Sequence, residues 1–588
     1  MKSEKSAVVA LFSLNFIGLK KARANIFFIV IVGLLFWIVL IPLAQLLLSS
    51  VRSGYPGDPG PWTLSKYAAV YATPLTYKML LNTFILAAGD TLITLSLALI
   101  FAWLIERTDM PYKDLAWALI LIPMAMPGLL FSMSWVLLLS PNTGVVNVWL
   151  RALLDLAGIH LEQGPLNIYS MGGMIFLEGI RGLTSLFLIL VAAFRMMDPS
   201  LEEAARVSGV TGWQTVRRVT LPVLMPAILV AGIYSFMSSL DSFEVPAVVG
   251  LPARIFVLST LIFFTARQAA PIDYGLSAAY ASLFLVITVL LVYIYHRVVR
   301  RTEDFATVTG KGYRPRLTRL GRWRYLAVGI FTVYFLLTTG APLLVLVWSS
   351  LLPRYRLPSW EALSSVSLAN YRAVLADEGA LIAIINTVKL MVITATVTML
   401  LALFISWLIV RSKAGSRWIL DAIAFIPHAI PGIVIGLALI FLYLQPPFSY
   451  LPIYGTVWII TLGLTTQYLA YSTRVTNAAI IQIHEELEEA ARVSGCTRFT
   501  TILRVTLPLM MPALVSGWIW VAIHTIRAFS TPLMLASRHN EVIAVRLWDY
   551  WDHGEMTTAT ALGVLFVLAL GIITFTGRKL ILRAVPGS

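Results

Sequence analysis

The string LEEAARVSG stands at residues 201–209 and again, unchanged, at residues 487–495. The similarity continues beyond the string: over 27 residues from Leu201, 19 are identical at a constant offset of 286. Upstream, IPMAMPG at 122–128 pairs with IPHAIPG at 426–432 at an offset of 304. Internal similarity at a fixed spacing is typical of a repeated architecture. The sequence therefore predicts two homologous halves within one chain.

The chain has the composition of a membrane protein. Of its 588 residues, 59% are hydrophobic and 12% are charged, and the mean hydropathy of +0.83 lies outside the usual range of soluble domains. Apolar runs of about 20 residues, the length that crosses a hydrocarbon core of about 30 Å, recur along nearly the whole sequence. The sequence predicts twelve membrane spans, at residues 26–48, 80–104, 115–139, 172–194, 223–245, 275–296, 326–350, 380–410, 418–444, 453–473, 509–530 and 557–577.

Lysine and arginine residues are distributed unevenly between the two sides of these spans. Of the 44, 30 lie in the terminal segments and in the loops that follow even-numbered spans, 11 lie in the other loops, and 3 lie inside spans. By the positive-inside rule, this bias predicts that both termini lie in the cytoplasm. The net charge of +15 is therefore explained by topology, and nucleic acid is not an expected partner.

The repeat and the charges together predict the domain organisation. The predicted segments are a cytoplasmic N-terminus at 1–25, a first six-helix half at 26–296, a basic cytoplasmic linker at 297–325, a second six-helix half at 326–577 and a cytoplasmic C-terminus at 578–588. Six spans separate the two copies of LEEAARVSG, so both copies lie on one side of the membrane. The expected fold is all-α and polytopic, with two parallel six-helix repeats that enclose a path at their interface. The arginine-rich linker is also suited to contact with anionic membrane lipid.

The repeated string lies in two cytoplasmic loops, 195–222 and 475–508, whose sequences predict two short helices around a glycine. In the first loop, Ser200–Glu203 is a capping-box pattern that starts a helix, and Gly209 provides a left-handed stop. Thr211–Gln214 is a second capping box for another short helix. We call each helix–glycine–helix unit an elbow. Its alanines allow another backbone to approach closely and its charges suit a polar rim, which is typical of a docking surface rather than of a catalytic site.

The second elbow is expected to have weaker caps. Glu486 stands where the first elbow has Ser200, and Thr500 stands where it has Gln214. Each elbow is followed by a Leu-Pro pair. Because proline is tolerated in a first helical turn, the fifth span is expected to begin at Leu221.

Both elbows fit one longer pattern: Glu-Ala-Ala, three residues, Gly, nine residues, then a β-branched residue, any residue and Leu-Pro. The first copy comprises Glu203, Ala204, Ala205, Gly209 and Val219–Pro222, and the second comprises Glu489, Ala490, Ala491, Gly495 and Val505–Pro508. The pattern resembles the EAA signature of ABC-importer permeases, with valine where isoleucine is commoner. The whole arrangement is similar to the fused, double-length permeases of binding-protein-dependent ferric-iron importers, with thiamine and aminoalkylphosphonate importers as relatives.

The resemblance implies that the elbows are coupling helices seated in two copies of a separate ABC ATPase subunit. It also implies a bacterial inner-membrane location, a periplasmic substrate-binding protein at the outer face, and one chain that supplies both permease halves. No GxxxxGK string followed by serine or threonine occurs in the sequence, so ATP and Mg²⁺ are expected in the ATPase subunit and no cofactor is expected in this chain. Ferric iron is the preferred cargo by resemblance alone. Thiamine, a phosphonate or another small solute is the alternative cargo. For each elbow, the alternative is an ordinary loop that only joins two spans.

Ionisable residues inside membrane spans are costly unless they are paired or hydrated, so they mark candidate pathway positions. The candidates in the fifth and eleventh spans are Asp241, Glu244, His524 and Arg527. Asp241 and Arg527 stand at equivalent positions of the two halves and have opposite charges. We expect them to pair across the interface as an outer gate, or Asp241 and Glu244 to assist the passage of a cation. Solvation of the helix ends is the alternative.

Two further features predict local structure within the spans. Glu178 and Arg181, three residues apart on one helix, are expected to neutralise each other. The prolines of IPMAMPG and IPHAIPG are expected to kink the third and ninth spans, either as gating bends or as static packing bends. Asp90, Lys389 and His428 also lie within spans and have no assigned role.

Two other function classes are less consistent with the sequence. A secondary transporter with twelve spans in two parallel halves would match the topology, but it would not need the same elbow twice. A membrane enzyme is not indicated, because neither a nucleophile–base pair nor metalloenzyme histidine spacing occurs, and no catalytic residue is assigned. No resident metal is assigned either, since Cys496 is the only cysteine. The external stretch Asp549–Glu555 has residue types that a ferric ion accepts, but a docking surface for the binding protein is the preferred interpretation.

Overall fold

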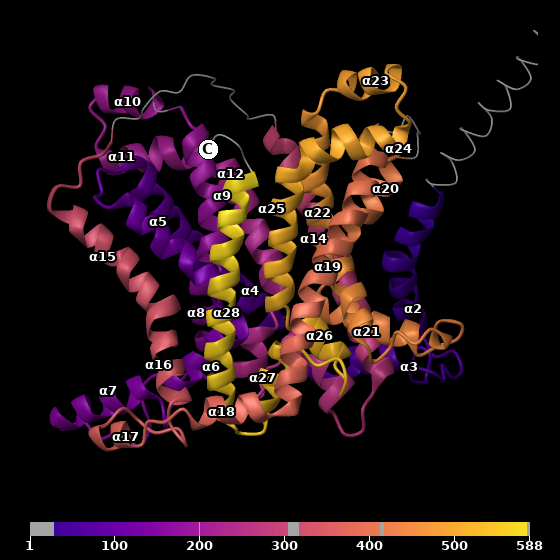
Figure 1. Ribbon diagram of the computed structural model, residues 1–588. Coiled ribbons are helices and arrows are strands. Elements are labelled where there is room, and N and C mark those ends of the chain that lie inside the picture. Colours follow the sequence, from indigo (N-terminus) through magenta and orange to yellow (C-terminus); the bar gives the residue numbers. More distant parts are fainter. Residues whose placement is uncertain (1–28, 199, 304–316, 412–416, 585–588) are drawn as a thin grey trace, which may run out of the picture.

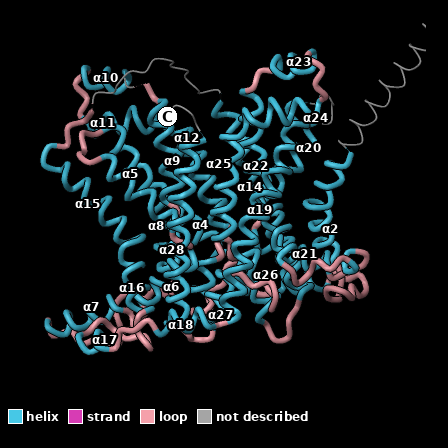
Figure 2. Tube along the Cα trace, viewed as in Figure 1, coloured by secondary structure: helices cyan, strands magenta, loops and turns pink. Residues whose placement is uncertain are grey.

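The computed structural model describes residues 29–198, 200–303, 317–411 and 417–584. Over these residues every regular element is a helix, and the long helices stand side by side between two rims of short ones (Figures 1 and 2). The fold class predicted from the sequence is confirmed. The predicted N-terminal segment 1–25 and much of the basic linker lie outside the described residues.

The two halves contain corresponding series of helices. Those of the first half are η1 (Phe36–Leu40), α2 (Ile41–Ser50), α3 (Ser65–Ala72), α4 (Pro74–Arg107), α5 (Lys113–Leu121), η2 (Ile122–Ala125), α6 (Gly128–Leu139), α7 (Val145–Leu156), α8 (Met171–Arg181), α9 (Leu183–Met196), α10 (Ser200–Val207), α11 (Gly212–Thr215), η3 (Val216–Thr220), α12 (Leu221–Leu240), η4 (Pro246–Gly250), α13 (Leu258–Phe263), η5 (Phe264–Gln268) and α14 (Tyr274–Glu303). Those of the second half are η6 (Gly321–Trp323), α15 (Arg324–Phe335), η7 (Leu336–Gly340), α16 (Ala341–Ser350), α17 (Trp360–Ser364), α18 (Ala369–Ala376), α19 (Glu378–Arg411), α20 (Arg417–Phe425), η8 (Ile426–Ala429), α21 (Gly432–Tyr443), η9 (Phe448–Tyr450), α22 (Val457–Gln482), α23 (Glu485–Val493), α24 (Arg498–Thr501), η10 (Ile502–Thr506), α25 (Leu507–Arg527), α26 (Ser530–Leu535), α27 (Ile543–Asp552) and α28 (Met556–Ala584).

The described chain contains eight helices that are long and apolar enough to cross a membrane, or up to eleven if each of three bent helix pairs is one span. These segments coincide with eleven of the twelve predicted spans. The predicted span 453–473 is instead α22, whose 26 residues are long enough but too polar for the same criterion. Its hydroxyl groups meet α19, where Thr398 Oγ1 donates to Thr465 Oγ1 at 3.2 Å and Ser406 Oγ donates to Thr473 O at 3.2 Å. Because protein groups satisfy these polar atoms, α22 does not need the apolar surface of a lipid-facing helix.

The third span of each half is broken at its proline-containing string, as the sequence predicted. The segment formed by α5 and η2 meets α6 at 98°, and the segment formed by α20 and η8 meets α21 at 110°. Pro127 and Pro431 are the extended residues that precede α6 and α21, since proline removes a helical hydrogen bond and clashes with the preceding turn. The fourth span of the first half is also bent, by 46° at Gly182, and the sequence analysis did not predict this bend. In the second half, Tyr468 stands at the equivalent position inside the continuous helix α22.

The fifth span begins earlier than the sequence analysis predicted. The helices α11, η3 and α12 form one continuous segment, Gly212–Leu240, with Pro222 inside it. The π-helical turn Val216–Thr220 ends one residue before this proline's neighbour Leu221, and the second half has the same turn at Ile502–Thr506, before Leu507 and Pro508. The wider turn accommodates the missing N–H and the bulk of the proline ring. Each elbow therefore continues into its span without a break.

Each half packs its first span against the other half, an exchange that the sequence did not reveal. The helices η1 and α2 pack against α20, α21 and α22 of the second half, and α15 and α16 pack against α5 and α6 of the first (Figure 1). Polar contacts accompany this packing: Thr466 Oγ1 donates to Ile38 O at 3.4 Å, and Tyr355 OH donates to Leu137 O at 2.8 Å. The exchange joins the two halves along two separate seams.

Both elbows lie on the same side of the molecule (Figure 1). There α10 and α11 of the first half and α23 and α24 of the second half form one rim, and the indigo start and the yellow end of the described chain point toward this side. The helices α7, α17 and α18 lie on the opposite rim. The parallel orientation of the two halves follows from this placement.

Candidate functional site

The first elbow has the geometry that its sequence predicts. Gly209 follows α10 with a φ of +82°, in the left-handed region that favours glycine, and Val210 N donates to Ala205 O at 3.1 Å, which closes the helix end. Thr211 caps α11: its hydroxyl accepts from Gln214 N at 3.4 Å, and Gln214 Oε1 accepts from Thr211 N at 3.2 Å. The predicted second capping box is confirmed.

The second elbow repeats this geometry with weaker caps. Gly495 has a φ of +88°, and Cys496 N donates to Ala491 O at 3.0 Å. The start of α23 has no side-chain cap, and the start of α24 has Thr500 N donating to Thr497 Oγ1 at 3.2 Å. The second helix of this elbow therefore lacks the reciprocal bond of the first elbow's capping box, which confirms the predicted weaker cap at this helix. The capping box predicted for the first helix of the first elbow adjoins residue 199, which lies outside the described residues, and it stays a prediction.

Both elbows present an uncovered surface. Val207 and Val493, at equivalent positions, are each 89% exposed. The alanines Ala204 and Ala490 are exposed, and the Glu489 side chain is 61% exposed. The half-exposed members of the repeated pattern are Glu203, Ala205 and Ala491. The predicted docking residues are therefore available on the rim rather than packed against the spans.

A cavity of about 400 Å³ lies between the two halves. Its acidic, basic and histidine lining residues are Asp90, Glu178, Arg181, Asp241, Glu244, His524 and Arg527. All four pathway residues predicted from the sequence are in this set. Asp90, which had no assigned role, joins them because α4 packs against α8, α9 and α12. Lys389 and His428 are not among the lining residues.

Arg181 joins two carboxylates on the wall that the first half provides. Arg181 Nη2 lies 2.9 Å from Glu178 Oε2, which confirms the pair predicted from the sequence. Arg181 Nη1 donates to Glu244 Oε2, and Ser242 Oγ donates to the second oxygen of Glu178. Glu244, predicted only as a pathway residue, is thus part of a three-residue ion network.

The second half has uncharged residues at the positions equivalent to Arg181 and Glu244. Gln467 takes the place of the central guanidinium, and Ser530 takes the place of Glu244. In both halves these groups crowd the glycine that follows the break of the third span. A Cβ added to Gly128 would lie 1.8 Å from Glu244 Oε2, and one added to Gly432 would lie 2.5 Å from Ser530 Oγ. In both halves a polar side chain therefore packs against this glycine, a carboxylate in the first half and a hydroxyl in the second.

Asp241 and Arg527 both line the cavity, but among the ion pairs of the described residues none joins them, so the expected direct pair is not present. The Asp241 carboxylate lies beside the backbone N–H of Gly432, the first residue of α21. Arg527 Nη2 donates to Met126 O at 3.3 Å, just after η2. Each side chain therefore contacts the broken third span of the other half. The carboxylate meets the positive end of a helix and the guanidinium meets a free carbonyl, which accounts for the opposite charges.

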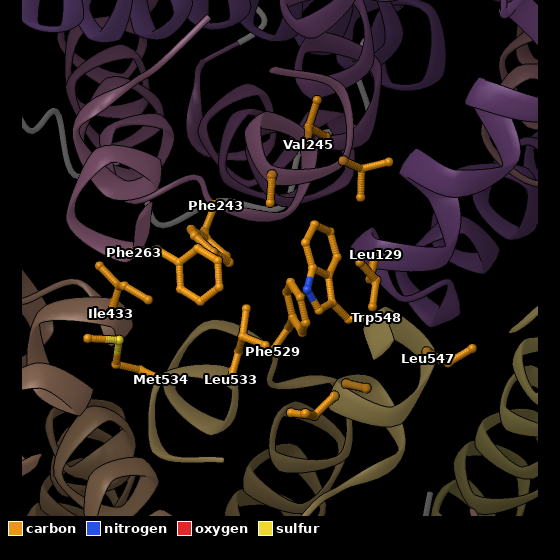
Figure 3. Packing of buried hydrophobic residues seen from close by; sticks show 14 of the residues in the cluster. Leu129, Phe243, Val245, Phe263, Ile433, Phe529, Leu533, Met534, Leu547 and Trp548 are labelled. Carbon is orange, nitrogen blue, oxygen red and sulfur yellow. The ribbon is translucent and has the colours of Figure 1, made fainter. Parts of the chain in front are cut away.

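Two equivalent phenylalanines meet across the halves at the ends of α12 and α25 that are distant from the elbows (Figure 3). Phe243 and Phe529 line the cavity, their ring centroids are 5.7 Å apart, and they are 3% and 2% exposed. Phe263 lies 5.5 Å from Phe243, and Trp548 lies 5.8 Å from Phe529. We call these four residues the outer closure. The sequence analysis missed it, because aromatic residues are common in apolar spans and only the matching repeat positions could have identified the pair.

The stretch Asp549–Glu555 comprises the end of α27 and the three residues after it, on the rim opposite the elbows. Arg546 Nη2 lies 2.8 Å from Asp377 Oδ2, and Arg546 Nη1 lies 3.1 Å from Asp549 Oδ2. Burial and the neighbouring Asp377 raise the pKa of Tyr550 to about 12. These contacts hold α27 against the start of α19. Throughout the described residues, no three His, Cys, Asp or Glu side chains lie close enough together to hold a metal ion.

The chain is similar to known membrane transport proteins. Residues 95–304 and 398–585 match the family described as binding-protein-dependent transport system inner membrane component. The ferric transport system permease protein FbpB of Actinobacillus pleuropneumoniae is 25% identical over 413 residues, which are 69% of this chain and 58% of that protein. The Fe(3+)-transport system permease protein FbpB 2 of Haemophilus influenzae is 20% identical over 520 residues, which are 88% of this chain and 92% of that protein.

A solved structure also shows a limited likeness. It is the crystal structure of a bacterial ABC transporter involved in the import of the acidic polysaccharide alginate, with a TM-score of 0.36 and 20% identity. The alignment covers 44% of this chain and 94% of the other. The chain thus spans less than two thirds of the first relative and nearly all of the second.

Proposed function

The chain belongs to the family of binding-protein-dependent transport system inner membrane components, and from this premise we propose that it is the permease subunit of an ATP-driven importer. The pair of matching elbows supports this proposal most directly. Both elbows lie on one rim, and in both the Glu-Ala-Ala residues and the glycine are exposed or half-exposed. The polar cavity between the halves supplies a candidate path for the cargo.

We assign ATP and Mg²⁺ to a separate ABC ATPase subunit, with one copy under each elbow. Closure of the two copies around nucleotide would draw the elbows together. A ligand that moves a two-state population from 1:99 to 99:1 needs a differential binding free energy of about 5.5 kcal/mol. Because α11, η3 and α12 are one continuous helical segment, a displaced elbow would move the fifth span directly. The fifth spans end beside Phe243 and Phe529, so this movement would open the outer closure.

We propose ferric iron as the cargo. The two relatives described above are named as ferric transport permeases. The cavity lining contains four carboxylates and two guanidinium groups, and this acidic excess favours a cation. Carboxylate and hydroxyl oxygens also suit a hard metal ion. Among the alternatives, the positively charged thiamine is compatible with the same lining, whereas a phosphonate anion would be repelled by it.

The opposite rim is the proposed docking surface for a periplasmic substrate-binding protein, with α27 and the external stretch Asp549–Glu555 as part of it. In this arrangement the chain lies in a bacterial inner membrane, with the elbows and both termini in the cytoplasm. The positive-inside bias of the sequence and the shared rim of the elbows support this orientation. The basic linker would then face anionic lipid of the cytoplasmic leaflet.

Reconstitution tests the proposal. Proteoliposomes containing the chain and its ATPase subunit are supplied with the ferric-loaded binding protein, and uptake of radioactive iron is measured with and without ATP. We expect uptake only when ATP and both partners are present, and a parallel assay with radioactive thiamine separates the two cationic cargoes. Solute movement by the chain alone, driven by an ion gradient, would establish a secondary transporter and overturn the proposal.

A further inference from the structure

A buried arginine connects the first elbow to the ends of two spans. Arg107 is the last residue of α4, and its Nη2 donates to Phe194 O at 2.9 Å and to Met197 O at 3.3 Å, at the end of α9. Its Nε lies 3.4 Å from Glu202 Oε2 on the elbow helix α10. The other oxygen of Glu202 accepts from Thr220 Oγ1 at 2.6 Å. One carboxylate of the elbow is therefore linked to α4, through Arg107 to the end of α9, and to the π-helical turn that leads into α12.

The second half contains the same network at equivalent positions. Arg411 ends α19, and its Nη2 donates to Ile480 O at 3.1 Å and to Ile483 O at 2.5 Å, at the end of α22. Its Nε lies 3.2 Å from Glu488 Oε1, and Thr506 Oγ1 donates to the same oxygen at 3.2 Å. Every residue of the network corresponds to one in the first half at an offset of 304 or 286, although arginine and threonine meet two oxygens of Glu202 and one oxygen of Glu488. The same network thus occurs in both halves of the chain, which indicates that both copies have the same role.

The four charged side chains are largely withdrawn from solvent. Side-chain exposure is 4% for Arg107 and 8% for Glu202, and 11% for Arg411 and 9% for Glu488. Buried charges persist when they are paired and when hydrogen bonds satisfy their remaining atoms. The two glutamates of LEEAARVSG therefore have different surroundings: the first is held inside the protein, and the second, Glu203 or Glu489, lies on the more open face of the elbow.

We infer that Arg107–Glu202–Thr220 and Arg411–Glu488–Thr506 are anchors that transmit elbow movement to the second, fourth and fifth spans of their halves. We call these two sets the anchors. The elbow helices α10 and α23 pack on η3 and η10, so packing by itself connects each elbow to the fifth span. The anchors add the ends of α4 and α9, or of α19 and α22, to the same rigid unit. Their residues are positioning residues, and the inference rests on the proposed function of the elbows.

The anchors are tested by separating ATP hydrolysis from transport. The double variant Glu202→Gln and Glu488→Gln keeps the size of the side chain and an acceptor for the threonine hydroxyl, but it removes the charge that pairs with arginine. In proteoliposomes with the ATPase subunit and the loaded binding protein, we expect ATPase copurification and ATP hydrolysis within twofold of the unmodified protein. We expect the amount of solute imported per ATP to fall at least tenfold. An unchanged ratio in a folded double variant would overturn the inference.

A matched control lies one residue further along each elbow. The double variant Glu203→Gln and Glu489→Gln alters the open face, so it is expected to reduce ATPase copurification while the import per ATP of the remaining complexes stays unchanged. Failure of this control alone would count against docking at the elbows, which belongs to the proposed function, and not against the anchors.

A second anchor variant, Arg107→Lys with Arg411→Lys, keeps the charge but loses the guanidinium group that reaches two carbonyl groups. We expect its import per ATP to lie between those of the unmodified protein and the glutamine variant.

Elbow movement is measurable without transport. Cys496 is the only cysteine of the chain, and Val210 is its equivalent in the first elbow, so Val210→Cys creates a pair for spin labelling across the two elbows. With a cysteine-free ATPase subunit, we expect nucleotide to change the distance between the labels equally with intact anchors and with the glutamine variant. Loss of that change in the glutamine variant would show that the network only folds the elbow, and the inference would be wrong.

Discussion

At the elbow rim the two halves share the string LEEAARVSG and one buried ion pair, whereas at the cavity they differ. Arg107 and Glu202 correspond to Arg411 and Glu488, and the four side chains make equivalent bonds. At the cavity, the charged network around Arg181 corresponds to an uncharged set around residue 467. The two elbows are therefore nearly the same in both halves, whereas the two cavity walls differ.

The difference has a physical reason in the number of partners that each region would meet. Two copies of one ATPase subunit would present the same surface twice, so both elbows must provide the same complementary shape and charge. The cavity is single, and one cargo would contact both walls at once. Its walls need only be complementary to the cargo together, so the carboxylates are concentrated on the first half. The comparison predicts equal effects for matching elbow variants and unequal effects for matching cavity variants.

The largest effect is expected at the elbows. Glu203→Lys and Glu489→Lys each place a positive charge on the face proposed to meet the ATPase subunit, and we expect either variant to reduce ATP-driven uptake to the background level. The two single variants should be equally severe, because both ATPase copies must close for one transport cycle. Uptake in proteoliposomes and copurification of the ATPase subunit measure this. A clear inequality between the two variants would break the proposed equivalence of the elbows.

The outer closure is expected to give the next largest effect. Phe243→Ala or Phe529→Ala removes one ring from the contact between the halves, and we expect leakage of solute through the chain without ATP. Because the two rings contact each other, the effects should be coupled, and the double variant should leak less than the sum of the single variants. Efflux from proteoliposomes that contain the chain alone measures this leakage. Additive effects would show that the two rings act separately.

Variants of Arg181 and of its equivalent Gln467 are expected to lose different amounts of unfolding free energy. Arg181→Gln leaves Glu178 and Glu244 without their cation, and breaking a largely buried ion network costs about 3 kcal/mol of unfolding free energy. Gln467→Ala removes only neutral contacts and should cost about 1 kcal/mol. Denaturant or thermal unfolding of the detergent-solubilised protein measures the two changes. Similar losses from both variants would contradict the asymmetry of the cavity walls.

The smallest effect is expected for Asp377, on the rim opposite the elbows. Burial opposes its ionisation, but hydrogen bonds from Tyr550 and Arg546 outweigh this and hold its pKa below the usual value. A carboxyl whose pKa is lowered by folding stabilises the protein above the unfolded pKa of about 3.9, and the stabilisation is lost as the pH falls through the lower folded pKa. Its contribution should be at most about 1 kcal/mol, as for exposed ion pairs.

The measurement is the unfolding free energy between pH 6 and pH 3. In Asp377→Asn, the unfolding free energy should change less with pH over this range. Thr73, the residue at the equivalent position of the first half, provides the control, because Thr73→Val should leave the pH dependence unchanged. A steep dependence that persists in Asp377→Asn would assign the effect to another carboxyl group.

The sequence predicted the regions that local chemistry determines. Gly209 and Gly495 adopt the left-handed conformation expected of a helix stop, and the prolines of the repeated strings break the third spans by 98° and 110°. Asp241 and Arg527 were identified as pathway candidates because charges are costly in spans, and both line the cavity. Their partners could not be predicted, since each contacts a backbone group in the other half. The contact between Phe243 and Phe529 was missed because aromatic residues are common in apolar spans and their meeting depends on how the two halves pack.

By itself, the sequence determined the helical class, most of the spans, the two halves and the shape of the elbows. These features depend on hydrophobic run length, capping groups, glycine and proline, which act within a few residues of chain. Only the tertiary structure decided that the first spans are exchanged between the halves, that the polar groups of α22 meet α19, and that the carboxylates of the cavity lie on the wall of the first half. These outcomes depend on which surfaces fit together across hundreds of residues, and such packing has no local signal in the sequence.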